Sequence, residues 1–298
     1  MSLALDWRTE SGGWPHREFS QQVQAGGIRF HVQVMGEGPV LLLLHGTGAS
    51  SHSWRDAAAA LAKSFTVVMP DLPGHGFTEV PSLGSLSLPA MARSIAALLK
   101  ALKLSPDLAA GHSAGAAILT RMALDGLIKP KVIISFNGAF FPFGGLAGQF
   151  FSPLAKLLVW NPLVPRVFAS SASQSSVQRL LDDTGSKLDA AGRDFYHRLF
   201  ANKGHVSGAL GMMANWDLRD LTPDMRRLVL PLVLVKALND RTVPPADADR
   251  ASSFAPGSRV IALPGLGHLA HEENPARAAD IIRDAFASLQ SPPGSIAS

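Results

Sequence analysis

Short, wholly apolar runs recur along the chain, and runs of this length indicate strands that are buried on both faces. They are Val40–Leu44, Phe65–Met69, Leu108–Ala110, Val132–Ser135, Leu232–Val235 and Val260–Leu263. Two earlier stretches, Arg17–Gln24 and Ile28–Met35, also have a strand-like composition, and Gly26-Gly27 between them is a hairpin signal. The pattern therefore predicts an eight-stranded, mostly parallel sheet.

Helical patterns separate these strands. Pro89–Leu102 and Ala114–Leu127 carry apolar residues at helical spacing. Pro275–Leu289 does the same, with Asn274 as a candidate N-cap and Pro275 at the first helical position. Strands that alternate with helices predict an α/β fold with helices on both faces of the sheet.

The alternation is interrupted once. Roughly 95 residues lie between the strands at Val132 and Leu232, far more than a crossover needs, and their composition is mostly helical. We therefore expect residues 1–138 and 226–298 to form the core and residues 139–225 to form an inserted helical cap or lid. From about residue 291 we expect a disordered tail.

Composition excludes several classes of protein. Apolar residues make up 47% of the 298 residues and charged residues 17%, which excludes a disordered chain. The net charge of +4 is small and scattered, so we expect no nucleic-acid partner. The chain has no cysteine, which excludes disulfides and thiol nucleophiles and fits a reducing compartment.

Two segments bear on membranes and targeting. Met1–Glu10 has no apolar run and does not resemble a signal peptide, so we expect a cytoplasmic protein. Val132–Ala155 has no formal charge and is long enough to span a bilayer, but Asn137, Pro142 and Pro153 interrupt it. We interpret this segment as a buried strand followed by an apolar lid, with no transmembrane span, and contact with a membrane surface stays open.

The sharpest chemical signal is Gly111-His112-Ser113-Ala114-Gly115, which has the form G-x-S-x-G between a predicted strand and a predicted helix. A tight turn of this kind requires small residues on both sides and raises the Ser113 hydroxyl above the sheet. The N-terminus of the helix that follows favours negative charge at the same place. The motif therefore predicts a serine nucleophile.

A serine hydroxyl needs a base to take its proton, and in this arrangement the base is a histidine late in the chain. His268 lies in a glycine-rich loop just after the last predicted strand. Loops at the carboxyl ends of parallel strands gather functional groups, so His268 is the predicted base and His271 is its rival. We expect His197 and His205 to be surface residues of the cap.

The acid and the oxyanion donors follow from the same strand order. Asp240 comes after the strand Leu232–Val235, whereas Asn137, at the end of the preceding strand, cannot ionise. Asp240 is therefore the predicted acid, which orients the imidazole. The backbone N–H groups of Thr47, in the loop after Val40–Leu44, and of Ala114 are the predicted oxyanion donors.

The remaining polar motifs predict no metal and no cofactor. Asp71–Gly76 is interpreted as a tight structural loop. His45, His52, His75 and His112 lack the spacing of metal ligands.

The chain resembles the α/β-hydrolase superfamily over nearly its whole length, because the motifs of that superfamily occur here in the same order. They are His45–Gly48, Asp71–Gly76, Gly111–Gly115, Asp240 and Gly267-His268. The resemblance implies an eight-stranded α/β-hydrolase fold, a catalytic triad and a nucleophile elbow. Serine at position 113 separates the chain from the branches that use an aspartate nucleophile.

A narrower resemblance is to the magnesium-chelatase accessory family of bacteriochlorophyll biosynthesis, the BchO type. It is carried by Leu5-Asp6-Trp7, Gly13-Trp14-Pro15, Phe30–Gly36, Gly46–Trp54, Asn137-Gly138-Ala139, Pro142–Gly145 and Gly211–Asp217. It implies a photosynthetic bacterium and a role near magnesium insertion into protoporphyrin, with chelatase subunits as candidate partners. It does not imply a particular reaction.

The cap is expected to decide the substrate. Its aromatic and methionine side chains suit a large apolar ligand, although they also suit the cap's own core. The candidate pocket residues are His45, Gly46, Trp54, His112, Phe140, Phe143, Met212 and Trp216.

These observations leave three hypotheses. The first is a serine hydrolase for an ester, lactone or similar bond of a small hydrophobic molecule, with a tetrapyrrole or its precursor as one candidate substrate. The second is a non-catalytic accessory protein that binds a porphyrin or a chelatase subunit on a hydrolase scaffold. The third keeps the triad but carries out lyase or C–C cleavage chemistry.

Overall fold

The computed structural model describes residues 5–142, 161 and 163–290. It contains one eight-stranded sheet in the order β1-β2-β4-β3-β5-β6-β7-β8. The strands are β1 Ser20–Ala25, β2 Ile28–Met35, β3 Val40–Leu44, β4 Thr66–Pro70, β5 Leu108–His112, β6 Val132–Phe136, β7 Leu232–Ala237 and β8 Arg259–Leu263. Only β2 runs antiparallel to its neighbours, β1 and β4, so the predicted mostly parallel α/β-hydrolase sheet is confirmed.

Helices alternate with these strands as the apolar pattern predicts. The described α-helices are α1 Trp7–Glu10, α2 Arg55–Leu61, α3 Leu88–Leu102, α4 Ala114–Leu124, α7 Leu163–Ser171, α8 Gln174–Asp183, α9 Ala190–Phe200, α10 Lys203–Asn215, α11 Leu221–Asp224, α12 Ala246–Ser252, α13 Ala270–Glu273 and α14 Pro275–Gln290. Asn274 caps α14 as expected, because its Oδ1 accepts a hydrogen bond from the Arg277 N–H at 3.0 Å.

Two predicted boundaries shift for local reasons. Residues Arg17–Phe19 form a 3₁₀ turn, so β1 begins only at Ser20. Helix α4 ends at Leu124, three residues before the predicted end. There the Leu127 N–H returns to the Met122 carbonyl at 2.9 Å and Gly126 adopts a φ of 70°, which is the geometry that ends many helices.

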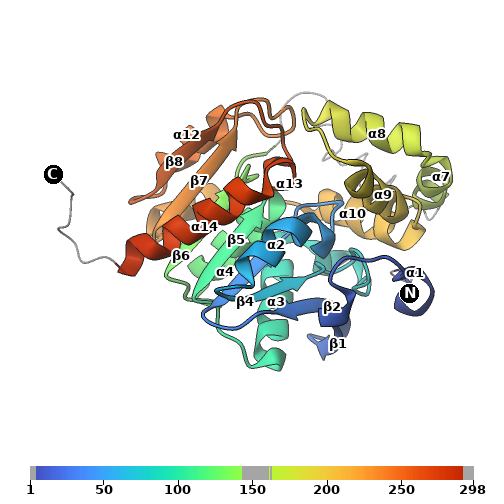
Figure 1. The fold of residues 1–298 in the computed structure, drawn as a ribbon, viewed down its shortest axis with the longest axis horizontal. Coiled ribbons are helices and arrows are strands. Elements are labelled where there is room, and N and C mark those ends of the chain that lie inside the picture. Colours follow the sequence, from blue (N-terminus) through green and yellow to red (C-terminus); the bar gives the residue numbers. More distant parts are fainter. Residues whose placement is uncertain (1–4, 143–160, 162, 291–298) are drawn as a thin grey trace.

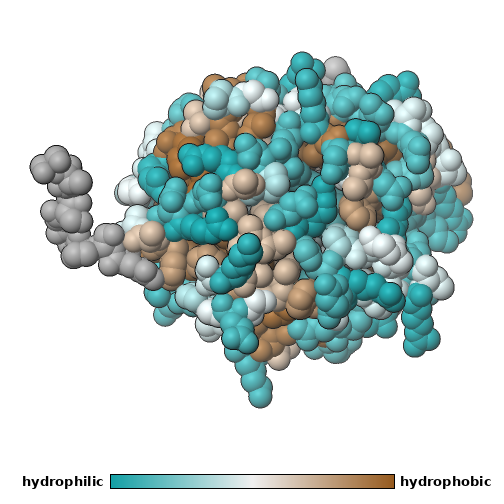
Figure 2. Space-filling model, in the orientation of Figure 1, coloured by the Kyte–Doolittle hydropathy of each residue, from teal (hydrophilic) through white to brown (hydrophobic). Residues whose placement is uncertain are grey.

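The core has two layers, one on each face of the sheet. Alternate residues of β3 face opposite layers: Leu42 and Leu44 pack with α3 and α4, whereas Leu41 and Leu43 pack with α2 and α14. In Figure 1, α2 and α14 cross in front of the sheet, and Figure 2 shows polar and apolar side chains interspersed over this face. Burial on both faces explains why the parallel strands are apolar throughout.

Helices α7 to α10 lie between β6 and β7 and sit together beside the carboxyl ends of the strands (Figure 1). Gly208 of α10 lies against the loop after β4, where a Cβ would come within 1.9 Å of the Gly74 carbonyl oxygen. This close approach holds α10 against the core. The candidate pocket residue Phe143, most of the predicted apolar lid and the tail after residue 290 lie outside the described residues. None of the described helices has the length and apolar character that a membrane span requires.

Candidate active site

Ser113 lies at a sharp turn between β5 and α4. Its backbone has φ 50° and ψ −116°, a conformation that L-residues rarely adopt. The turn is tight, since a Cβ on Gly111 would lie 2.6 Å from the Ala116 nitrogen and one on Gly115 would lie 2.5 Å from the Leu44 carbonyl oxygen. The glycines of the G-x-S-x-G motif are thus explained by close backbone contacts.

His268 and Asp240 are in direct contact. The Nδ1–H of His268 donates to Asp240 Oδ2 at 2.8 Å, and the Asp240 side chain is only 1% exposed. The backbone N–H groups of Thr242 and Val243 donate to the other carboxylate oxygen at 2.7 and 2.9 Å. Asp240 is therefore held rigidly against one ring nitrogen of His268, so that Nε2 is the nitrogen left for a proton.

Asn137 cannot ionise and was not a predicted site residue, but its side chain lies at Asp240. Asn137 Nδ2 donates to Asp240 Oδ2 at 2.5 Å, so this oxygen accepts from both Asn137 and His268. Asn137 has a φ of 49°, a conformation that asparagine tolerates better than most residues. Its place at the end of β6, next to β7, was the available signal.

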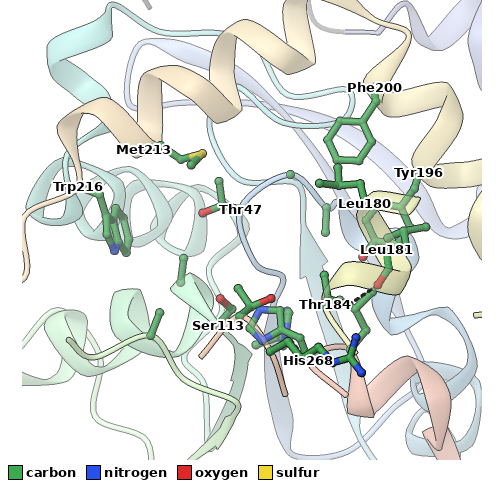
Figure 3. Close-up of a pocket in the computed structure, with 18 residues that line it drawn as sticks. Thr47, Ser113, Leu180, Leu181, Thr184, Tyr196, Phe200, Met213, Trp216 and His268 are labelled. Atoms are coloured by element: carbon green, nitrogen blue, oxygen red, sulfur yellow. Dashed lines mark hydrogen bonds between the residues drawn. The ribbon is translucent and has the colours of Figure 1, made fainter. Parts of the chain in front are cut away.

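Ser113 and His268 lie together on the floor of a pocket of about 400 Å³ (Figure 3). Trp216 and Met213 stand on one side of it, and Leu180, Leu181, Tyr196 and Phe200 stand on the other. The other described lining residues are Thr47, Gly48, Ala49, His112, Ala114, Ala139, Thr184, Arg241, Thr242 and Leu269. The pocket is therefore mostly apolar above a polar floor.

Of the predicted pocket residues, His112 and Trp216 line this pocket and Phe143 lies outside the described residues. The other five do not line it: His45, Gly46, Trp54, Phe140 and Met212. Met212, Phe140 and Trp54 are packed in the hydrophobic core, and Met213, one residue further along α10, faces the pocket instead. A helix turns by about 100° per residue, so a shift of one position decides which side chain reaches the ligand.

His45 and Gly46 act behind the pocket. The Nε2 of His45 accepts a hydrogen bond from the Leu72 N–H at 2.9 Å and its Nδ1–H donates to the Gly46 carbonyl at 2.7 Å. A Cβ on Gly46 would lie 2.8 Å from His112 Nδ1 and 3.1 Å from the Ser113 Cβ. Both residues therefore support the floor without facing the pocket.

His205 corrects another expectation, because it is buried and is not a surface residue. Its Nδ1 accepts from the Gly76 N–H and its Nε2–H donates to the Gly48 carbonyl, both at 3.1 Å. Burial lowers the pKa of His205 to about 4, so the ring is neutral and connects α10 to two core loops. Its neighbours in the sequence, Gly204, Val206 and Ser207, give no signal of this role.

His271, the rival base, stands behind the floor. Its ring centroid is 4.4 Å from those of Trp54 and His112, and the residue is 1% exposed. Burial, followed by the nearby His268, holds the pKa of His271 well below its usual range. His112 is similarly neutral: burial is the main cause of its lowered pKa, and its Nε2–H donates to the His268 carbonyl at 2.9 Å.

The two predicted oxyanion donors border the pocket on either side of Ser113. Thr47 and Ala114 both line it, from the loop after β3 and the first residue of α4. Over residues 5–142 and 163–290, neither backbone N–H donates to a loop or turn carbonyl. Both N–H groups are therefore free to bind an oxygen of a ligand.

The Asp71 loop has a structural role. Asp71 accepts hydrogen bonds from His31 Nδ1 at 2.9 Å and from the backbone N–H groups of Ser51 and Phe77 at 2.7 and 2.9 Å. These partners, led by the charge of His31, lower the pKa of Asp71 despite its burial. Among the described residues no group of three or more His, Asp or Glu side chains is arranged to hold a metal ion.

Residues 41–281 match the model of the alpha/beta hydrolase family. The chain belongs to this family. It is similar to the magnesium-chelatase 30 kDa subunit of Rhodobacter capsulatus, with 38% identity over 90% of this chain and 94% of that protein.

Other family members extend the comparison. A pimeloyl-[acyl-carrier protein] methyl ester esterase of Aeromonas hydrophila is 28% identical over 84% of this chain and 96% of its own length. The crystal structure of an alpha/beta hydrolase fold protein from Burkholderia ambifaria superposes with a TM-score of 0.75 at 22% identity, covering 95% of this chain and 100% of that chain. The last likeness concerns the fold alone.

Proposed function

We propose that the protein is a serine hydrolase that cleaves an ester or lactone-like bond in a small hydrophobic molecule. The observation that carries this proposal is the 2.8 Å contact between His268 Nδ1 and Asp240 Oδ2, in a pocket whose floor also holds Ser113. A histidine oriented in this way presents Nε2 as a base toward a serine. The apolar walls suit a hydrophobic substrate.

The proposed reaction begins when His268 Nε2 takes the proton of the Ser113 hydroxyl as its oxygen attacks the carbonyl carbon. The Thr47 and Ala114 N–H groups receive the negative charge that develops on the carbonyl oxygen. His268 then gives its proton to the leaving alcohol, and the acyl group stays on Ser113. A water molecule, deprotonated by His268, releases the acid and restores the serine.

Asp240 stabilises the imidazolium that forms twice in this cycle. Its four hydrogen bonds, from Thr242, Val243, Asn137 and His268, keep it in place as a charged acceptor. In the proposed cycle the carboxylate orients the imidazolium of His268 and does not accept its proton.

Replacement of Ser113 by Ala tests the proposal. We expect turnover of activated esters to fall by at least about 10⁴-fold, because the nucleophile is lost while the fold is kept. A fluorophosphonate probe should label the wild type and the matched variant Ser253→Ala, whose serine is exposed at the end of α12, but not Ser113→Ala. Unchanged turnover in Ser113→Ala would refute the hydrolase.

The similarity to the magnesium-chelatase 30 kDa subunit supports a second candidate, a non-catalytic accessory that binds a porphyrin or a chelatase subunit. It also links either function to magnesium insertion into protoporphyrin. In a strain that lacks the gene, an accessory role predicts that Ser113→Ala restores pigment synthesis as well as the wild type does. A hydrolytic role predicts that it does not.

A further inference from the structure

Arg241 is the feature of the pocket that the proposed hydrolysis does not use. It follows the acid directly in the loop between β7 and α12, and it lines the pocket with Thr242. The neighbouring N–H groups of Thr242 and Val243 hold the Asp240 carboxylate, and the Arg241 N–H donates to the Thr184 carbonyl at 3.1 Å. The backbone that carries Arg241 is thus fixed on both sides.

The described residues that line the pocket include one cationic side chain and no acidic one. Among the described lining residues, Arg241 carries the one permanent charge, and none is an aspartate or glutamate. In the same part of the chain its guanidinium forms no ion pair, although several other arginines do. The nearest acid along the chain, Asp240, is buried and already accepts from four donors.

The opposite side of the pocket is apolar. Thr184, to which Arg241 is bonded, lies on the side of His268 in Figure 3, whereas Met213 and Trp216 stand across the pocket. Leu180, Leu181, Tyr196 and Phe200 stand on the side of Thr184, so a ligand that fills the pocket would meet apolar side chains on both sides and one unpaired cation, Arg241. A planar guanidinium matches the two oxygens of a carboxylate in a bidentate pair.

We infer that the substrate carries a carboxylate in addition to the bond that is cleaved, and that Arg241, which lines the pocket, binds this carboxylate. The inference rests on the proposed function for the identity of the cleaved bond. Arg241 is exposed, so the pair stays partly hydrated. Its contribution is therefore moderate and decreases as salt concentration rises.

A matched pair of substrates tests this directly. One is the mono-p-nitrophenyl ester of octanedioic acid, whose far end is a free carboxylate, and the other is the same ester with that end methylated. We expect kcat/KM of the wild type to favour the free acid about 3–5-fold, mainly through KM, which is the value of one exposed ion pair. Arg241→Gln should abolish this preference, Arg241→Lys should keep part of it, and 0.5 M NaCl should reduce it.

The control is Arg259→Gln, which removes the same charge from an exposed position at the start of β8, away from the pocket. It should keep the wild-type preference. A wild type that does not distinguish the two esters, or an Arg259→Gln variant that loses the preference equally, would overturn the inference. A stronger preference for the phosphonate-ended analogue would overturn the carboxylate assignment.

A binding measurement separates this inference from the proposed hydrolysis. Calorimetry on Ser113→Ala should show tighter binding of octanedioic acid monomethyl ester than of its dimethyl ester, and the added Arg241→Gln change should remove the difference. If the esters are not hydrolysed but this difference is present, the hydrolase fails and the carboxylate site stands. If neutral esters are hydrolysed through Ser113 without any such difference in binding, the hydrolase stands and the carboxylate site fails.

Discussion

At the scale of single residues, Asn137 is a neutral side chain that supplies a hydrogen bond to the buried carboxylate of Asp240. Its amide donates to the carboxylate oxygen that also binds His268. A second donor fixes the orientation of the Asp240 carboxylate beside the His268 side chain, which is 8% exposed. Asn137 is therefore a positioning residue in the proposed mechanism.

Replacement of Asn137 by Gly isolates this hydrogen bond. Glycine accepts the φ of 49° at this position without strain, so the backbone is kept while the amide is lost. We expect kcat for an activated ester to fall about 10–100-fold, the value of one hydrogen bond to a charged partner, with KM little changed. A steady-state assay that shows an unchanged kcat would contradict the positioning role.

Gly46 has a different role, because it leaves room for His112 and for Ser113, the proposed nucleophile. An alanine there would press on His112 and Ser113, at 2.8 and 3.1 Å. We expect Gly46→Ala to lower kcat by about 100-fold or more, since a displacement of less than 1 Å at a nucleophile is costly. Gly12→Ala is the matched control, because a Cβ there meets nothing within 4 Å, and it should leave ester turnover at the wild-type rate.

At the scale of elements, helix α9 is fastened to the core by a buried polar group. The Tyr196 hydroxyl of α9 donates to Glu272 of α13 at 2.6 Å, and Arg55 of α2 donates to the other Glu272 oxygen at 3.1 Å. Arg55 also reaches Asp189 at the start of α9, at 3.4 Å. Since Tyr196 lines the pocket, this connection sets the position of one pocket wall.

Glu272 gives this connection a pH dependence. Burial raises the pKa of Glu272 from 4.5 to about 7 in the folded protein, against the opposing effects of Tyr196 and Arg55. The folded state therefore keeps a proton that the unfolded chain releases near pH 4.5. The stabilisation is complete below pH 4.5 and is lost as the pH rises through 7.

The variant Glu272→Gln reveals this effect, because glutamine keeps an acceptor for Tyr196 but does not titrate. The free energy of unfolding of the wild type relative to the variant should fall by about 3 kcal/mol between pH 4.5 and 7. Urea denaturation of both proteins at several pH values measures it. A constant difference would show that Glu272 does not hold its proton.

At the scale of the whole molecule, buried histidines dominate the response to acid. Burial lowers the pKa of six of them: His45, His52, His75, His112, His205 and His271. They support loops, pack against one another and are neutral in the folded state. In the unfolded chain each binds a proton near pH 6.5.

The protein should therefore lose stability in acid. Below pH 6.5 the unfolded state binds as many as six protons that the folded state does not bind. The free energy of unfolding therefore falls as the pH decreases from 6.5 toward 4. The single proton of Glu272 acts in the opposite direction and is outweighed. Urea unfolding at pH 7.5, 6.5 and 5.5 should show midpoints that fall in this order, and a rising or constant midpoint would contradict the expectation.

Much of the fold could be predicted from apolar patterns, and the reason is local. Runs such as Val40–Leu44 are buried on both faces, so their sequence shows no alternation and identifies a parallel strand. Ends of elements were predicted less well. The end of α4 depends on the return of the Leu127 N–H to Met122, a contact between positions that apolar periodicity does not mark.

The order of the candidate residues along the strands can be read from the chain alone: a serine in a glycine turn after β5, an acid after β7 and a histidine after β8. This order follows from backbone constraints within a few residues. Four further facts depend on the packing of distant elements: Asn137 also binds Asp240, Met213 and not Met212 faces the pocket, His205 is buried, and Arg241 has no ion-pair partner among the described residues. Such facts depend on how distant elements pack, because the direction of a side chain and the identity of its neighbours are fixed by contacts that lie far apart in the chain.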